Sequence, residues 1–485
     1  MAGISGQKIL LLLFVTALIV RVVFWLFFPS PYHGLIRGEM VSDAVEYDII
    51  ARNLVSGGGF GYYSGVPTAF RNPVTPFLGA LVYLLTGPNP AAVQILMLII
   101  GSLIPPVLYV LARQYIEPAS ALLAGAIAVF YPSLVTFSTA FMTEVPFALL
   151  ILLALLCWNR FTMTTRGGWG IIVNGSVFMG LALLTRSTPG PLLLLWILYL
   201  IVDGGRERWK HLLRFAVYCG IAFLVILPWC VRNHAIFGQW SWVATNGGYT
   251  IWQRYNHLPP DGTIDSRKDV QQELQRIYNT INTRIDAGYE PADAFRPYMA
   301  QTVRGYLLRL GPEEADYIHS FDGLNEAQID RRLFREAIAV MFEYPRRTAI
   351  KLVKNIIKYW EPYYDPDLNH RVRRYYLAYG IMAPFMLWGL ILSVPQRRRF
   401  MILYITIFGF WLTSAIALHQ IRYRLPVECI GLIFASVAVI TLFRRPGKPW
   451  LPWVIIGIVV SMNIVIMLFG GPFFHNIREA IHAIN

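Results

Sequence analysis

Eleven apolar runs constrain this chain more than any other feature of its sequence. A helix needs about 17–25 apolar residues to cross the hydrocarbon layer of a bilayer, and flanking aromatic residues extend the shorter runs toward that length. The runs cover residues 9–28, 91–112, 118–137, 144–158, 170–184, 189–202, 211–230, 377–394, 401–418, 426–443 and 452–469. They predict an all-α polytopic membrane protein with about eleven transmembrane helices.

The composition excludes the main alternatives. Hydrophobic residues make up 56% of the 485 residues and charged residues only 14%, whereas soluble proteins carry roughly a quarter. The net charge of +14 arises in short loops between apolar runs, which follows the positive-inside bias and argues against nucleic-acid binding. The four cysteines lie in or beside apolar runs, so neither a disulfide framework nor a zinc site is expected.

A twelfth apolar run, residues 73–85, decides the orientation of the chain. At about 1.5 Å per residue it reaches only about 20 Å, so we expect a re-entrant or surface helix. All strongly basic loops then fall on one side, the cytoplasmic one. Three segments fall on the outer side, namely residues 29–72, 138–143 and 232–376.

Three regions follow from this reading. Residues 1–231 form an N-terminal transmembrane module that includes the first outer loop, 29–72. Residues 232–376 form a large, mainly helical outer segment, with helix-like stretches near 269–285, 292–310 and 325–342. A basic amphipathic stretch at 344–359 suits a helix on the membrane surface. Residues 377–485 form the C-terminal transmembrane helices.

Two acids are expected at the outer membrane surface. Asp43 lies in the first outer loop, and helical spacing places Tyr47 on the same face. Asp43 is either a helix cap, with Glu46 completing a capping box, or a carboxylate that activates or orients a substrate. Glu144 opens the fourth span after Thr143, and span parity places it on the same side as Asp43. Two converging acids suit acid–base or sugar-orienting chemistry.

Several basic residues fall on the same outer side, where the positive-inside trend disfavours them. Each is interpreted either as a contact to anionic lipid headgroups or as a clamp on the phosphate of a lipid-linked substrate. They are Arg71, Arg186, Arg232, Arg422 and Arg424. His419, at the end of a span, is either a base or ligand or an ordinary polar contact. Arg21, in the middle of the first span, must pair or face a cavity.

The sequence lacks the common short motifs of metal-dependent, thiol redox and nucleotide-binding enzymes. It has no HExxH, no CxxC, no Walker loop and no GxGxxG in a strand–helix context. Gly57-Gly-Gly-Phe-Gly follows no predicted strand, so it is interpreted as a flexible turn. Nucleotide sugars and ATP are therefore not expected as donors.

Taken in order, several short motifs resemble those of the GT-C glycosyltransferases, and in particular of family 39-like enzymes such as protein O-mannosyltransferases and aminoarabinose transferases. Each motif is weak alone, but the ordered set spans most of the chain. The motifs are Ser42-Asp-Ala-Val-Glu-Tyr with Gly57-Gly-Gly, the basic residue before Pro73, Thr143-Glu144, Leu181-Ala-Leu-Leu-Thr-Arg-Ser, Pro228-Trp-Cys-Val-Arg-Asn, Phe237-Gly, Thr245-Asn-Gly-Gly and Arg422-Tyr-Arg-Leu-Pro.

The resemblance implies a GT-C fold in the bacterial inner membrane, with the active site facing the periplasm. It implies transfer of a sugar from a polyprenyl-phosphate donor to a glycan, lipid or protein acceptor, with inversion at the anomeric carbon. Asp43 would activate or orient the acceptor, Glu144 would be the second acid, and Arg71 would meet the lipid phosphate. The mannosyltransferases have a second acid directly after the first, where this chain has Ala44.

No cofactor or metal is required by this chemistry, although a divalent metal between carboxylates stays open. Two other functions remain as alternatives. One is a transporter or flippase of lipid-linked saccharides, which would more naturally place ionisable groups in the middle of several spans. The other is a glycan ligase or polymerase that uses a diphosphate-linked donor. The sequence leaves the sugar and the acceptor open.

Overall fold

The structure is a computed structural model. It describes residues 6–27, 41–163, 169–203, 208–255, 283, 287, 320–321, 323–364, 374–417, 421–444, 447 and 449–483. Every predicted apolar run coincides with helix in these segments. The helices are α1 (Gly6–Phe27), α3 (Val41–Val55), α4 (Val74–Thr86), α5 (Pro90–Ala112), α6 (Pro118–Phe130), α7 (Pro132–Phe137), α8 (Glu144–Met163), α9 (Trp169–Thr185), α10 (Pro189–Asp203), α11 (Arg208–Phe237), α12 (Gly247–Tyr255), α17 (Glu326–Glu343), α18 (Pro345–Lys358), α19 (Leu377–Ser393), α20 (Arg397–Ile416), α21 (Leu425–Phe443) and α22 (Leu451–Ala483).

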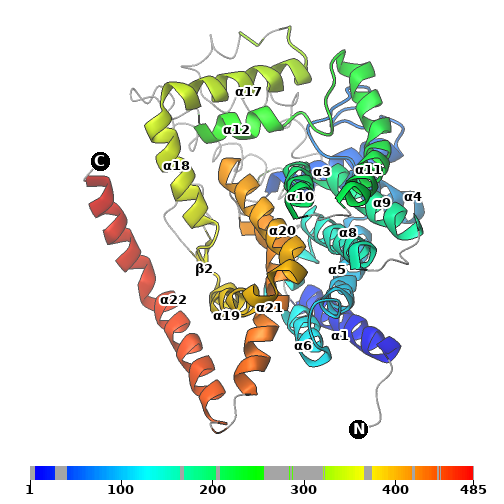
Figure 1. Ribbon diagram of the computed structural model, residues 1–485. Coiled ribbons are helices and arrows are strands. Elements are labelled where there is room, and N and C mark those ends of the chain that lie inside the picture. Colours follow the sequence, from blue (N-terminus) through cyan, green and yellow to red (C-terminus); the bar gives the residue numbers. More distant parts are fainter. Residues whose placement is uncertain are drawn as a thin grey trace.

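Six helical stretches in the described residues are long and apolar enough to cross a membrane, and one of them, residues 377–416, contains both α19 and α20. The shorter apolar helices include α4, which has 13 residues, as the sequence predicts. In Figure 1, α3 and α4 lie at the same end of the bundle as α12 and α17. This is the end that the sequence assigns to the outer side.

One predicted span is interrupted. The run 118–137 was expected to form a single helix, but α6 ends at Phe130 and α7 begins at Pro132. Tyr131, between them, has an extended backbone with φ −66° and ψ 115°. The ring of a proline disfavours the helical conformation for the residue before it, which accounts for the break. The expectation of one continuous helix was therefore wrong.

The outer segment is described only in part. Helix α17 matches the predicted stretch 325–342 and starts with a capping box between Asn325 and Gln328. The predicted helix-like stretches at 269–285 and 292–310 lie outside the described residues, except for position 283. Two short strands, β1 (Tyr363–Tyr364) and β2 (Arg374–Tyr375), form an antiparallel pair before α19.

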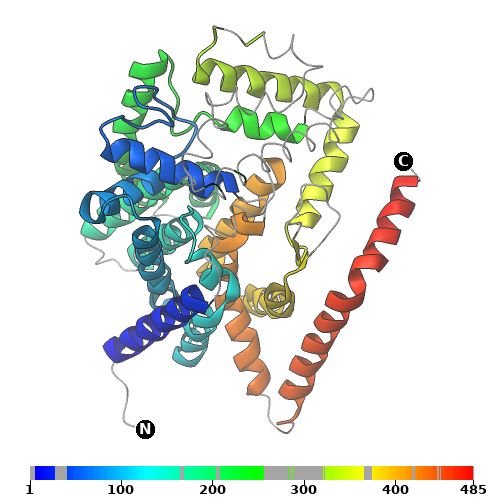
Figure 2. The same cartoon turned by 180° about the vertical axis from the view of Figure 1, so that it is seen from behind.

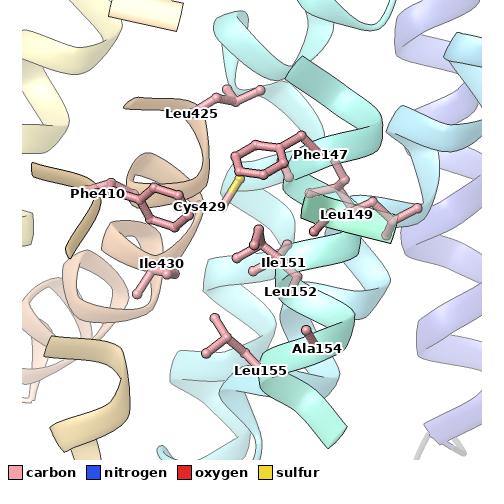
Figure 3. Close-up of a cluster of buried hydrophobic side chains, with 14 of the residues drawn as sticks. Phe147, Leu149, Ile151, Leu152, Ala154, Leu155, Phe410, Leu425, Cys429 and Ile430 are labelled. Carbon is pink, nitrogen blue, oxygen red and sulfur yellow. The ribbon is translucent and has the colours of Figure 1, made fainter. Parts of the chain in front are cut away.

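Helices α8, α20 and α21 pack together in the core of the bundle. Figure 3 shows apolar side chains of α8, among them Ile151 and Leu155, beside Cys429 and Ile430 of α21. Phe147 of α8 meets Phe410 of α20 edge to face, with ring centroids 5.8 Å apart. Between membrane helices such contacts act through close packing rather than through exclusion of water. They fix the first residues of α8 relative to the segment that precedes α21.

Helices α19 and α21 approach each other closely. A Cβ atom at Gly389 of α19 would lie 1.8 Å from the carbonyl oxygen of Phe434 on α21, so only glycine fits there. Helix α22 contacts mainly α19 and α21, and it diverges from the bundle toward the C-terminus in both Figure 1 and Figure 2. Helices α20 and α21 also pack on α10 and α6, so the C-terminal helices join the N-terminal ones in one bundle.

Arg21 lies inside the bundle and is fully buried. Its guanidinium donates to the Ser138 hydroxyl at 3.1 Å and to the carbonyl oxygens of Ala17 and Val129. The sequence could not identify these partners, because carbonyl oxygens are present at every residue. Its contacts are internal to the helices α1, α6 and the turn after α7.

Candidate active site

Six charged side chains form a continuous set of contacts at the end of the bundle that carries α3, α12 and α17. Carboxylates and guanidiniums alternate, so that each acid lies between or beside arginines. We call this set the ion-pair array, and it consists of Glu46, Arg71, Asp43, Arg422, Glu144 and Arg186. The formal charges cancel, three against three.

Asp43 is the acid at the centre of this array. Its Oδ1 lies 2.7 Å from Nη2 of Arg71, and its Oδ2 lies 2.7 Å from Nη2 of Arg422. Helix α3 begins at Val41, so Asp43 lies inside the first turn rather than at the cap position. Burial alone would raise the pKa of Asp43, but Arg422 and Arg71 outweigh it and hold that pKa well below its usual range.

Two further acids, Glu46 and Glu144, position the arginines of the array. Glu46, one turn after Asp43 on α3, is fully buried and accepts hydrogen bonds from Nε and Nη2 of Arg71. It also accepts a hydrogen bond of 2.7 Å from the Tyr62 hydroxyl. Glu144, at the start of α8, lies 2.7 Å from Nη2 of Arg186 and 3.6 Å from Nε of Arg422. These bonds fix the guanidinium planes.

Aromatic rings and a hydroxyl complete the support. The Arg186 guanidinium lies 4.5 Å from the ring centroid of Tyr423, and its Nε donates to the Thr143 hydroxyl at 2.7 Å. The Arg71 guanidinium lies 5.8 Å from the ring of Tyr47. Arginine suits such stacked, forked contacts better than lysine does.

A cavity of about 160 Å³ opens beside the array. Three charged residues of the ion-pair array line the cavity, namely Asp43, Arg71 and Arg186. The other three, Glu46, Glu144 and Arg422, do not line it. The described lining residues are Asp43, Tyr47, Arg71, Asn72, Thr143, Phe147, Thr185, Arg186, Ser187, Thr188, Asn246, Thr250, Phe410, Thr413, Ser414, Ala417 and Tyr423. The cavity thus presents one carboxylate, two guanidiniums and several hydroxyl and amide groups.

The outer segment holds the backbone next to Arg71 in place. The Glu326 carboxylate, at the start of α17, accepts hydrogen bonds from the Ala69 amide and from the hydroxyls of Thr68 and Thr245. Asn246 donates to the carbonyl oxygen of Phe70 at 2.8 Å. Residues 68–70, directly before Arg71, are therefore clamped between α17 and the start of α12.

The structure brings together seven of the ten candidate residues from the sequence, which are Asp43, Glu46, Tyr47, Arg71, Glu144, Arg186 and Arg422. Arg232 lies elsewhere, where it donates to the carbonyl oxygens of Thr68 and Phe60 and stacks on Trp229. His419 lies outside the described residues.

Arg424 also points away from the cavity. It is fully buried, pairs with Glu428 at 2.7 Å and stacks against the Tyr379 ring. Residues 421–424 form a 3₁₀ turn, in which side chains two positions apart point in widely different directions. Arg422 and Arg424 therefore serve different sites, although the sequence grouped them together.

Sequence reasoning missed several lining residues. Thr250 lies one helical turn after Asn246 on α12, so the quoted Thr245-Asn-Gly-Gly motif could have led to it. Thr413 and Ser414 lie near the end of α20 and are ordinary polar residues in an apolar run, which gave no signal. Glu326 carried no signal either, because it is one of many acids in the outer segment.

In the described part of the chain, no group of three or more His, Cys, Asp or Glu side chains is arranged to hold a metal ion. Asp43 and Glu46 both contact Arg71.

Comparisons with known proteins bear on this geometry. The family model described as dolichyl-phosphate-mannose-protein mannosyltransferase matches residues 68–231, a range that contains Arg71, Glu144 and Arg186 but not Asp43. No curated protein matches the chain.

Several solved structures resemble this chain. The archaeal oligosaccharyltransferase AglB from Archaeoglobus fulgidus, in complex with an inhibitory peptide and a dolichol-phosphate, matches 96% of this chain and 54% of its own, with a TM-score of 0.51 and 15% identity. Its apo form gives the same coverage and TM-score at 14% identity. ArnT from Cupriavidus metallidurans bound to undecaprenyl phosphate matches 89% of this chain and 78% of its own, with a TM-score of 0.39 and 15% identity.

The chain therefore spans about half the length of the oligosaccharyltransferase that it resembles. It has the fold of the GT-C superfamily, a class of multi-pass membrane proteins, and the resemblance predicted from its motifs is confirmed. Below 25% identity the structural likeness establishes the fold, so the reaction must be argued from the cavity itself.

Proposed function

We propose that this protein is a membrane glycosyltransferase that moves a sugar from a polyprenyl-phosphate donor to an acceptor, with inversion, on the outer face of a bacterial inner membrane. The observation that carries the proposal is the cavity whose wall carries the Asp43 carboxylate together with the guanidiniums of Arg71 and Arg186. Two guanidiniums suit a phosphate, and a carboxylate suits a hydroxyl or amino acceptor.

The proposed reaction uses these groups as follows. A nucleophilic atom of the acceptor attacks the anomeric carbon from the face opposite the phosphate. The bond between that carbon and the phosphate oxygen breaks, and its electron pair leaves with the oxygen. Arg71 and Arg186 stabilise the growing charge on the phosphate, while Asp43 accepts the proton of the acceptor.

The low pKa of Asp43 makes it a weak base while Arg71 and Arg422 contact it. A phosphate at Arg71 would compete with Asp43 for the same guanidinium, which lies 2.7 Å from the carboxylate. Loss of that contact raises the pKa of Asp43 and strengthens it as a base. Donor binding would thus prepare the carboxylate for the acceptor, and Glu46 would keep Arg71 in position.

The outer segment would close the cavity and contribute to acceptor binding. Asn246 and Thr250 bring its first helix, α12, to the cavity wall, and α17 packs on α12. The lining of the cavity includes residues from each of the three proposed regions, 1–231, 232–376 and 377–485.

The test uses purified protein in nanodiscs and a panel of radiolabelled polyprenyl-monophosphate sugars, with release of polyprenyl phosphate as the readout. Asp43→Asn is expected to reduce release at least about a hundredfold, the usual contribution of a positioned base. Asp48→Asn is the matched control, because Asp48 lies on the same helix and pairs with Arg52 outside the cavity.

Other outcomes would overturn the proposal. Release from a diphosphate-linked donor alone would identify a ligase or polymerase. Movement of intact lipid-linked sugar across the bilayer, without cleavage and regardless of the Asp43→Asn change, would identify a transporter.

A further inference from the structure

A second cavity, of about 560 Å³, lies at the opposite end of the helix bundle from the candidate active site. It forms where the α5–α6 connection, the start of α20 and the end of α21 meet. The described residues that line it are Arg113, Tyr115, Ile116, Glu117, Pro118, Ser120, Leu392, Ser393, Gln396, Arg399, Phe400, Val437, Thr441 and Arg444. None of them lines the candidate active site.

Contacts between the connections hold this cavity in shape. Nη2 of Arg399 donates to the carbonyl oxygen of Gln114 at 2.9 Å, and the Gln114 side chain accepts a hydrogen bond of 2.6 Å from Asn159 on α8. Nη1 of Arg444 lies 2.6 Å from the Glu117 carboxylate. The turn between α5 and α6 is thereby tied to α8, α20 and α21.

The wall of the cavity carries more positive than negative charge. It contains three guanidiniums, of Arg113, Arg399 and Arg444, and one carboxylate, of Glu117, which pairs with Arg444. In the described part of the chain neither Arg113 nor Arg399 has a carboxylate partner. Both side chains are exposed, so their guanidiniums are accessible to an anionic ligand in the cavity.

The remaining wall is apolar and aromatic, with hydroxyls between. The rings of Tyr115 and Phe400 stack with centroids 5.6 Å apart, and Leu392 and Val437 lie beside them. Thr441, on the last turn of α21, is exposed and also lines the cavity. A ligand that fits must combine an anionic group with an apolar part.

We propose that this cavity binds the headgroup of an anionic glycerophospholipid. The cavity lies at the ends of apolar, membrane-length helices, which is where phosphate groups of the bilayer are found. Guanidiniums bind phosphate oxygens in pairs, and basic pockets between membrane helices suit such headgroups. The apolar part of the wall would contact the start of the acyl chains. A soluble phosphate would use only the guanidiniums.

The experiment measures binding of phosphatidylglycerol to delipidated, detergent-purified full-length protein by native mass spectrometry, with phosphatidylcholine of the same chain length as the neutral competitor. The test variant is Arg113→Gln/Arg399→Gln. The control is Arg397→Gln/Arg398→Gln, which removes the same amount of charge, from the turn that contains Arg399, at positions that do not line the cavity.

The test variant is expected to bind phosphatidylglycerol about 25-fold more weakly, from about fivefold for each basic side chain at an anionic surface. The control is expected to stay within about twofold of the wild type. A second variant, Thr441→Phe, keeps every charge but places a bulky ring at the cavity wall, and it is expected to weaken binding as well. Far-ultraviolet circular dichroism of each variant checks that the helices persist.

Three results would overturn the proposal. The first is an equal loss in the test and control variants, which would indicate a general surface charge effect. The second is phosphatidylcholine binding as strong as that of phosphatidylglycerol. The third is displacement of the lipid by inorganic phosphate at matching concentration, which would identify a site for a soluble anion.

Discussion

Arg422→Met tests the ion-pair array through its central cation. The Arg422 side chain is 9% exposed and contacts both Asp43, at 2.7 Å, and Glu144, at 3.6 Å. Methionine has a similar length but no charge, so the variant leaves three buried carboxylates against two guanidiniums. Breaking a buried ion pair by removing one partner costs about 3–5 kcal/mol, because the other charge stays buried.

The expected result is a lower thermal stability, by about 6–10 °C if each kcal/mol shifts Tm by about 2 °C in a large chain. Tryptophan fluorescence of the purified protein suits the assay, since the chain has 14 tryptophans. The double variant Arg422→Met/Asp43→Asn should regain part of the loss, because it also removes the unbalanced carboxylate.

The pH dependence gives a second readout. In the wild type the pKa of Asp43 is depressed, so its contribution to stability is present above the unfolded pKa of about 3.9 and is lost as the pH falls through the lower folded value. In Arg422→Met the loss of one guanidinium raises the pKa of Asp43 relative to the wild type, so a fall in pH should cost the variant less stability than it costs the wild type. A double variant no more stable than Arg422→Met at pH 7 would refute the reasoning.

Three further outcomes are expected. Arg186→Gln should lower turnover about a hundredfold or more, as does loss of one donor to a transition-state oxyanion, measured as release of polyprenyl phosphate. Glu326→Gln should weaken donor binding, since residues 68–70 position Arg71, and donor titration of the folded variant should show a larger change in KM than in kcat. Burial raises the pKa of Asp330 to about 6, against its usual value of about 3.8, so stability should fall as the pH rises between about 4 and about 6. Asp330→Asn should remove that fall in a series of thermal melts.

The sequence predicts helices well because bilayer-spanning length is a strong constraint. Each of the eleven apolar runs contains helix, and the short run before Gly87 forms α4. The break before Pro132 was also readable in principle, since proline restricts the residue before it. What the sequence could not supply was the arrangement of the helices, which depends on contacts such as that between Gly389 and Phe434.

The candidate site was predictable in its residues but not in its pairings. Span parity placed Asp43, Glu144 and Arg186 at one end of the bundle, where the structure has them. Parity gives only the side of the membrane, however, so Arg232 and Arg424 were grouped with them although their side chains lie elsewhere. To predict the direction in which such a side chain points, one needs to know exactly where its helical turn begins.

Buried acids in the apolar runs carried information that the sequence reading did not use. Glu428, in the first turn of α21, is buried and pairs with Arg424. An ionisable residue inside a span requires a partner, as was argued for Arg21. The same argument applied to Glu428 would have separated Arg424 from the arginines at the cavity.

The central claim is that Asp43 acts on a polyprenyl-monophosphate sugar in this cavity. The most direct measurement compares release of polyprenyl phosphate by wild type, Asp43→Asn and Asp48→Asn in nanodiscs, over the panel of labelled donors. We expect release with at least one donor, a loss of about a hundredfold in Asp43→Asn, and near-normal release in the control. Equal release by wild type and Asp43→Asn would contradict the account.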